Sequence, residues 1–173
     1  VSHGASVNMK VNDILQKVEL SFSFASGVNK YAFRPQNVGF GLSYVLSLLI
    51  MVLTAQPGDC IVLENPEAHI HPRGQAEFGK LMSLAASAGI QIIVETHSDH
   101  IVNGVRVAIK NGIIDRHFAV IQFFNRVNHQ HPEHGIFEQY SVVRKIEIDS
   151  RGELSEYPDD FLDEWDRQLR HLI

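Results

Sequence analysis

The fold is constrained most by two apolar segments near the middle of the chain. Each segment ends abruptly in acidic and histidine residues. Residues 60–72 read CIVLENPEAHIHP and residues 90–100 read IQIIVETHSDH. A short apolar run that stops at charged residues is typical of a buried strand in a parallel sheet. Parallel strands deliver their carboxyl ends to one edge of the sheet, where open α/β proteins bind ligands. The candidate site residues at this edge are Glu64, Asn65, Glu67, Glu95 and His97.

A third segment, residues 37–46, reads NVGFGLSYVL and places two glycines before an apolar stretch. The apolar stretch predicts a helix over residues 42–53 that is buried on nearly every side. Residues without bulk at the start of a helix let backbone amides come close to a phosphate group. Gly39 and Gly41 are the two residues without bulk in this segment.

The order and spacing of these three segments resemble those of ABC-type ATPases of the RecF, SMC and OLD kind. Residues 37–46 resemble the ABC signature, residues 60–72 the Walker B strand and D-loop, and Thr96, His97 and Ser98 the switch-histidine loop. Together the motifs cover residues 37 to about 112. The resemblance implies an α/β fold, the carboxyl-terminal lobe of a P-loop NTPase, with parallel strands, flanking helices and a small strand–helix appendage.

The resemblance also implies roles at the predicted sheet edge. Glu64 takes the position of the carboxylate that holds the hydration shell of Mg²⁺, a cation that prefers oxygen ligands. Asn65 takes the position where these enzymes usually have a catalytic glutamate, and an amide cannot accept a proton. Glu67 or Glu95 would then serve as the base while Asn65 orients the attacking water. His97 would contact the γ-phosphate of ATP.

Other positions match parts of the family that act between two subunits. Gly39, Gly41 and Ser43 correspond to the signature, which faces ATP bound on a partner, and His71 corresponds to the D-loop, where the subunits touch. The resemblance therefore implies a homodimer that closes around ATP. Relatives of this kind act in DNA repair, DNA processing and defence against phage, so DNA or an effector protein is the expected further partner.

No stretch of the chain matches the P-loop pattern GxxxxGK[ST], whose amides and lysine hold the phosphates of the nucleotide. The glycine-containing segments SHGAS (residues 2–6) and ASGVNK (residues 25–30) lack its spacing. We therefore expect a truncated or split ATPase, whose P-loop half lies upstream or on another chain.

Two alternatives stay open at this stage. Glu95, His97, Asp99 and His100 resemble the HxHxDH loop of metallo-β-lactamase-like enzymes, with a glutamate in place of the first histidine, which suggests a binuclear metal hydrolase. Asn65 and the missing P-loop suggest instead a non-hydrolysing interaction lobe. The histidine-rich run HQHPEH, residues 129–134, is interpreted as a solvent-exposed loop.

Hydrophobic periodicity predicts the remaining elements. In chain order they are a short helix closed by Ile14 and Leu15, a hairpin of strands over residues 17–24 and around 31–33 with a turn at 26–27, helices over 73–88 and from 98 or 99 to 110, a strand over 118–124, a strand over 141–148, a turn at 150–152, and a final helix opened by Pro158. The last helix carries an apolar stripe: Phe161, Leu162, Trp165, Leu169 and Leu172.

We predict an ATPase lobe over residues 1–113 and an appendage over residues 114–173. The tail of the appendage resembles a small domain of unknown function that ends many prokaryotic ATPases of this kind, and we expect it to dock on the ATPase lobe.

Composition fits a cytoplasmic globular protein. The formal net charge is −5, which gives no general attraction to nucleic acid or anionic lipid. Cys60 is the single cysteine, it cannot form an internal disulfide, and we expect it to be buried in its strand. Residues 38–55 lack charges, but glycine and hydroxyl residues dilute them, so a membrane span is not expected.

Overall fold

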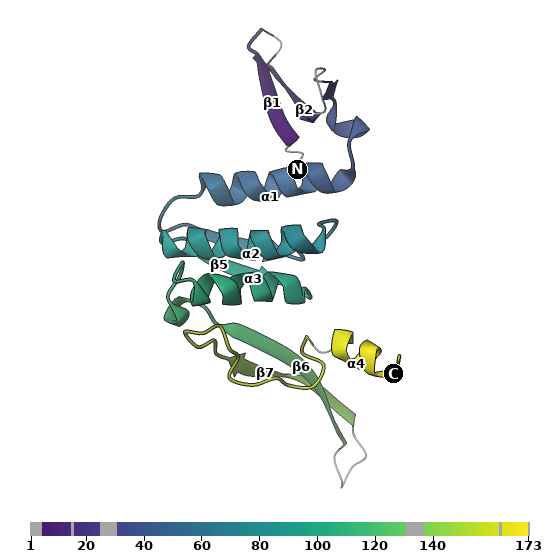
Figure 1. Ribbon diagram of the computed structural model, residues 1–173, viewed down its shortest axis with the longest axis vertical. Coiled ribbons are helices and arrows are strands. Elements are labelled where there is room, and N and C mark those ends of the chain that lie inside the picture. The colour runs from purple at the N-terminus through teal and green to yellow at the C-terminus, as the bar shows by residue number, and fades with distance from the viewer. Residues whose placement is uncertain (1–4, 15, 25–30, 131–136, 163, 173) are drawn as a thin grey trace. The chain divides into compact units, whose positions relative to one another are not determined.

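The computed structural model describes residues 5–14, 16–24, 31–130, 137–162 and 164–172 of the chain (Figure 1). It is an α/β protein that divides into two compact units. The first unit contains residues 1–54 and 68–70, and the second contains residues 55–67 and 71–173.

The first unit begins with an antiparallel sheet of strand order β1-β2-β3. Its strands are β1 (Ala5–Asn12), β2 (Lys17–Phe24) and β3 (Ala32–Phe33). The strands predicted over residues 17–24 and around 31–33 are confirmed, whereas the predicted turn at residues 26–27 lies outside the described residues. The helix predicted to end at Ile14 and Leu15 is wrong. Residues 5–12 alternate apolar with polar side chains, so they pair with β2 as a strand instead.

Helix α1 (Phe40–Thr54) follows a short 3₁₀ turn, η1 (Pro35–Asn37). The helix forms where the sequence predicts it, but its expected burial on nearly every side is wrong. Leu48 and Val52 are its buried residues, whereas Leu53 is 67% exposed. A helix that is apolar all round is buried only where neighbours pack on every side, and the exposed side chains of α1 show that the described residues do not surround it. Within the described parts of the chain, no helix has both the length and the apolar character to cross a membrane.

The second unit is built on two parallel strands, β4 (Cys60–Glu64) and β5 (Gln91–Glu95), as the apolar segments predict. Helices α2 (Pro72–Ser87) and α3 (Asp99–Lys110) lie side by side in front of β5 (Figure 1). The predicted boundaries of both helices are confirmed to within one residue. Ser98 caps α3 by accepting a hydrogen bond from the Ile101 amide at 3.2 Å.

Two glycines set the close packing of these helices. A Cβ atom added to Gly79 of α2 would lie 3.1 Å from the Cα of Gly104 in α3 and would collide with the carbonyl oxygen of Ile101. A Cβ atom added to Gly104 would collide in the same way with the carbonyl oxygen of Ala76. The two backbones therefore touch at a crossing that admits only hydrogen at these positions.

The strand pair is covered on one face and open on the other. Ile61 and Leu63 are buried, whereas Val62 is 67% exposed, and its register partner Ile93 is 52% exposed. The expectation that Cys60 is buried is therefore wrong, because Cys60 shares the open face with Val62. Alternation along a strand sends successive side chains to opposite faces, and the described part of the chain covers just one of them.

The carboxyl-terminal part of the second unit contains a 3₁₀ turn, η2 (Arg116–Phe118), and an antiparallel hairpin of β6 (Ile121–Gln130) and β7 (Phe137–Ile146). The predicted strands over 118–124 and 141–148 are present with shifted limits, since Phe118 lies in η2 and β7 ends at Ile146. Ile146, Ile148, Leu154 and Phe161 form a core with Ala108 and Ile109 of α3.

The last helix, α4 (Glu164–Arg170), begins six residues after Pro158, so the predicted helix start is wrong. Asp160 and Leu162 have positive φ angles of 65° and 56°, which no α-helix contains. The predicted apolar stripe is also wrong as a single buried face. Phe161 is buried, but Leu172 is 82% exposed. The side chain of Trp165 lies outside the described residues.

Arg106 of α3 holds the predicted turn at residues 150–152 against the helix. Its Nε donates to the carbonyl oxygen of Gly152 at 2.7 Å, and its Nη1 donates to Asn103 Oδ1 at 2.8 Å. Nη2 donates to the Tyr157 hydroxyl at 3.4 Å. The tail is thus docked on α3, as the sequence predicts, by a side chain that contacts both a backbone carbonyl and an aromatic residue.

Candidate functional site

The carboxyl ends of β4 and β5 bring two carboxylates side by side. Glu64 and Glu95 are register partners in the parallel ladder, so their side chains point to the same face, on strands that lie about 4.8 Å apart. Both residues are exposed. A pair of accessible carboxylates provides the oxygen ligands that Mg²⁺ prefers, and it also provides a proton acceptor.

Asn65 turns the chain at the end of β4. Its φ angle is 46°, in the left-handed region that asparagine tolerates better than most residues. Its backbone N–H donates to the carbonyl oxygen of Glu95 at 2.9 Å, which extends the ladder by one bond beyond the strand pair. The local backbone therefore gives a reason for asparagine here, because glutamate would occupy the same conformation at a greater steric cost.

Glu67 joins this turn to the loop that follows β5. One carboxylate oxygen accepts a hydrogen bond from the Thr96 hydroxyl at 2.8 Å, and the other accepts one from the His97 backbone N–H, also at 2.8 Å. Glu67 and Thr96 are half-buried, whereas His97 is exposed. The structure therefore brings Glu67 and His97 together, as the sequence predicts, but the contact is with the backbone of His97.

The same network reaches the start of α3. The Thr96 hydroxyl accepts a hydrogen bond from the Ser98 N–H at 3.0 Å, and the Ser98 hydroxyl donates to Gln75 Oε1 at 2.6 Å. Gln75 Nε2 in turn donates to the carbonyl oxygen of Glu67 at 3.4 Å. Sequence reasoning missed Gln75, which lies in the first turn of α2. The one signal that points to it is its position three residues after Pro72, at the end of the HIHP segment.

His71 caps α2. Its Nδ1 accepts a hydrogen bond from the Arg73 N–H at 3.2 Å, so this nitrogen satisfies one of the free amides at the helix start. His71 is exposed. Its predicted part in a contact between subunits stays a prediction, alongside this capping role.

The predicted signature residues belong to the first unit. Gly41 and Ser43 lie in the first turn of α1, and the carbonyl oxygen of Ser43 accepts from the Ser47 hydroxyl at 3.2 Å. A Cβ atom at Gly41 would collide with the carbonyl oxygen of His69, whose ring packs edge-on against Phe40 with centroids 4.9 Å apart. Close packing therefore accounts for glycine at position 41.

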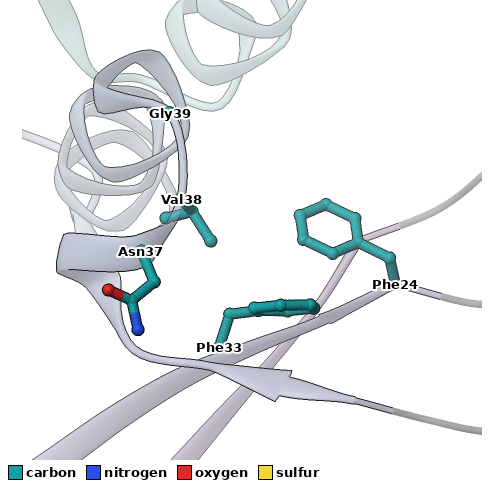
Figure 2. Close-up of a pocket in the computed structure, with 5 residues that line it drawn as sticks. All are labelled: Phe24, Phe33, Asn37, Val38 and Gly39. Carbon is teal, nitrogen blue, oxygen red and sulfur yellow. The ribbon is translucent and has the colours of Figure 1, made fainter.

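A hollow of about 280 Å³ lies beside Gly39 in the same unit. Figure 2 shows the rings of Phe24 and Phe33 on one side of this hollow and the turn of Asn37, Val38 and Gly39 on the other. The ring centroids are 6.0 Å apart. Among the described residues, no atom comes within 4 Å of a Cβ added at Gly39, so packing there does not demand glycine.

The histidine motifs that suggest a metal hydrolase gain no support. Asp99 and His100 lie in the first turn of α3, with 3.6 Å between His100 Nε2 and Asp99 Oδ1. No group of three or more histidine, cysteine, aspartate or glutamate side chains in the described parts of the chain is placed to hold a metal ion. Residues 131–136, which include most of the run HQHPEH, lie outside the described residues.

Comparison with known proteins identifies two family matches. Residues 6–103 match the family described as "AAA domain, putative AbiEii toxin, Type IV TA system". Residues 119–172 match DUF3696, a protein family of unknown function. No curated protein matches the sequence.

One similar solved structure is described as "Structural biochemistry of ATP-driven dimerization and DNA stimulated activation of SMC ATPases". It is 12% identical, with a TM-score of 0.48, over 96% of this chain and 82% of that one. The match to the AAA-domain family spans more than half of the chain and includes residues 37–46, 60–72 and 96–98. The chain therefore belongs to this family of ABC-like AAA ATPases, with a DUF3696 region at its carboxyl end.

Proposed function

We propose that the carboxyl ends of β4 and β5 carry the residues that hydrolyse ATP, and that a P-loop half binds this ATP. The observation that carries the proposal is the register of β4 and β5, which pairs Glu64 with Glu95 at the carboxyl end of a parallel ladder. Membership of an ATPase family supplies the substrate class. Mg²⁺ bound at this edge would offset the charge of the phosphates.

In this proposal, Glu64 holds the hydrated Mg²⁺ and Glu95 accepts the proton of the attacking water. Asn65 follows Glu64 directly, and its side-chain amide can hydrogen-bond the water without accepting its proton. His97 contacts the γ-phosphate from the neighbouring loop. Glu95 is favoured over Glu67 as the base because each oxygen of Glu67 already accepts a hydrogen bond, whereas Glu95 is exposed at the strand end.

We further propose that two copies close around ATP. The signature residues Gly39, Gly41 and Ser43 would face nucleotide bound to the other copy, with His71 at the contact between copies. The hollow beside Gly39 leaves the backbone of that glycine open to an approaching ligand. A DNA substrate or an effector protein would then be the target of the ATP-driven closure.

The test is turnover by the chain combined with a P-loop half, followed as phosphate release. The variants Glu64→Gln and Glu95→Gln should each lower kcat by about 10²-fold or more, the size expected when a metal ligand or a general base is lost. Binding of ATP by Glu95→Gln should stay close to that of the parent protein, because the base acts in the chemical step.

Glu77→Gln is the matched control, since Glu77 is an exposed glutamate of α2 whose partner is Lys80, at 2.9 Å. It should turn over like the parent. Equal activity of Glu64→Gln, Glu95→Gln and the parent would contradict the proposal. ATP binding without turnover in the parent protein would favour the non-hydrolysing lobe instead.

A further inference from the structure

The hydrogen bonds around Glu67 form a closed ring. The carboxylate accepts from Thr96, the Thr96 hydroxyl accepts from the Ser98 amide, the Ser98 hydroxyl donates to Gln75, and the Gln75 side chain donates to the backbone of Glu67. Every link lies within the second unit. The ring ties three elements together: the turn after β4, the loop after β5 and the first turn of α2.

The carboxylate makes the charge-assisted contacts of this ring. Its two oxygens accept from two different donors at 2.8 Å each, a hydroxyl and a backbone amide. Hydrogen bonds to an ionised acceptor are roughly twice as strong as neutral ones. Both acceptor oxygens of Glu67 are therefore engaged by donors from the loop after β5.

We infer that Glu67 is a positioning residue, whose carboxylate fixes the Thr96–His97 backbone so that the exposed imidazole of His97 starts from a defined place at the sheet edge. The inference rests on the proposed function only for the contact between His97 and the γ-phosphate. The hydrogen bonds by which Glu67 holds the Thr96–His97 backbone are present in the chain without nucleotide.

The experiment measures hydrogen exchange of the His97 backbone amide by NMR in the full chain without nucleotide. In Glu67→Gln the side chain is uncharged and keeps one oxygen, so an NH₂ group replaces one of the two acceptors that the Thr96 hydroxyl and the His97 amide use. We expect the His97 amide to exchange about tenfold faster or more, as expected when a hydrogen bond to a charged group is lost. Unchanged exchange at His97 would overturn the inference.

Two variants separate this effect from a general loss of structure. Thr96→Val removes the hydroxyl that accepts from Ser98, so faster exchange should appear at the Ser98 amide, while Glu67 still holds the His97 amide. Glu64→Gln alters a carboxylate at the same edge, three residues from Glu67, and should leave the His97 amide as protected as in the parent. Faster exchange throughout the second unit in Glu67→Gln would also overturn the inference, because it would report unfolding.

Turnover with a P-loop half gives a second readout. A positioning role predicts a loss of about tenfold in kcat for Glu67→Gln, with the pH profile unchanged in shape. A loss of 10²-fold or more together with unchanged His97 exchange would make Glu67 the base and overturn the inference. If no variant and no parent protein hydrolyses ATP, the proposed function fails, while the exchange result still decides the inference.

Discussion

The two faces of the β4–β5 pair differ in what they contribute to the molecule. On the covered face, Leu63 is 4% exposed, and the helices α2 and α3 cross at two glycines. On the open face, Val62 is 67% exposed and leads directly to the carboxylate pair of Glu64 and Glu95. Neighbouring residues of one five-residue strand thus pack into the core on one face and present the candidate site residues on the other.

The largest stability difference should come from truncating one residue on each face. Leu63→Ala removes a buried side chain and should lower the free energy of unfolding by about 3 kcal/mol. Val62→Ala removes an exposed one and should change it by less than about 0.5 kcal/mol. Urea denaturation of both variants measures the contrast. Equal losses would show that the open face is covered in solution.

A second variant tests the covered side at the helix crossing. Gly104→Ala places a methyl group against the carbonyl oxygen of Ala76, so the helices must separate, at a cost of about 2 kcal/mol. Gly39→Ala is the control, because a Cβ atom there has open space among the described residues. Denaturation that leaves Gly104→Ala as stable as the parent would mean that the helices do not cross this closely.

Substitutions on the open face should change the free energy of unfolding through charge rather than through packing. Glu64 and Glu95 are like charges on adjacent strands, so Glu64→Gln should raise the free energy of unfolding by about 0.5 kcal/mol at low salt. The gain should shrink in high salt, where screening weakens the repulsion. A loss of stability in Glu64→Gln would contradict this account, because it would show that the two carboxylates do not repel each other in solution.

The smallest change in stability should come from the turn at residues 150–152, which Arg106 of α3 holds through the carbonyl oxygen of Gly152. Hydrogen bonds from the backbone amides of Glu153 and Arg151, together with the Arg151 side chain, lower the pKa of Asp149. A lowered folded-state pKa gives stability that is present above the ordinary aspartate value, about 3.9, and is lost as the pH falls through the folded value. Asp149→Asn should therefore be slightly less stable than the parent at pH 7, and the difference should shrink toward pH 3. A difference that stays constant between these pH values would contradict this account.

The elements around the candidate site could be predicted because their signals are local. Strands β4 and β5 are apolar runs with sharp ends, α3 has its capping serine, and α2 ends before Gly89. Parallel pairing then follows from the helix between the strands. The edge carrying Glu64 and Glu95 could thus be predicted as well.

The missed features depend on partners far away in the sequence. Glu67 and Thr96 are 29 residues apart, and neither residue alone signals the bond between them. The crossing of Gly79 with Gly104 likewise needs the positions of two helices. The burial expected for Cys60 failed for a related reason, because a short apolar run does not reveal whether one face or two will be covered.

Because Cys60 is exposed, its thiol can be labelled on the open face of the strand pair. It is the only cysteine in the chain, and it stands on the same side of β4 as Val62 and Glu64. A thiol-reactive fluorophore would therefore attach at one defined place, without any engineered substitution. Its emission would change when another protein covers this face, so the wild-type chain carries its own reporter for any partner that binds there.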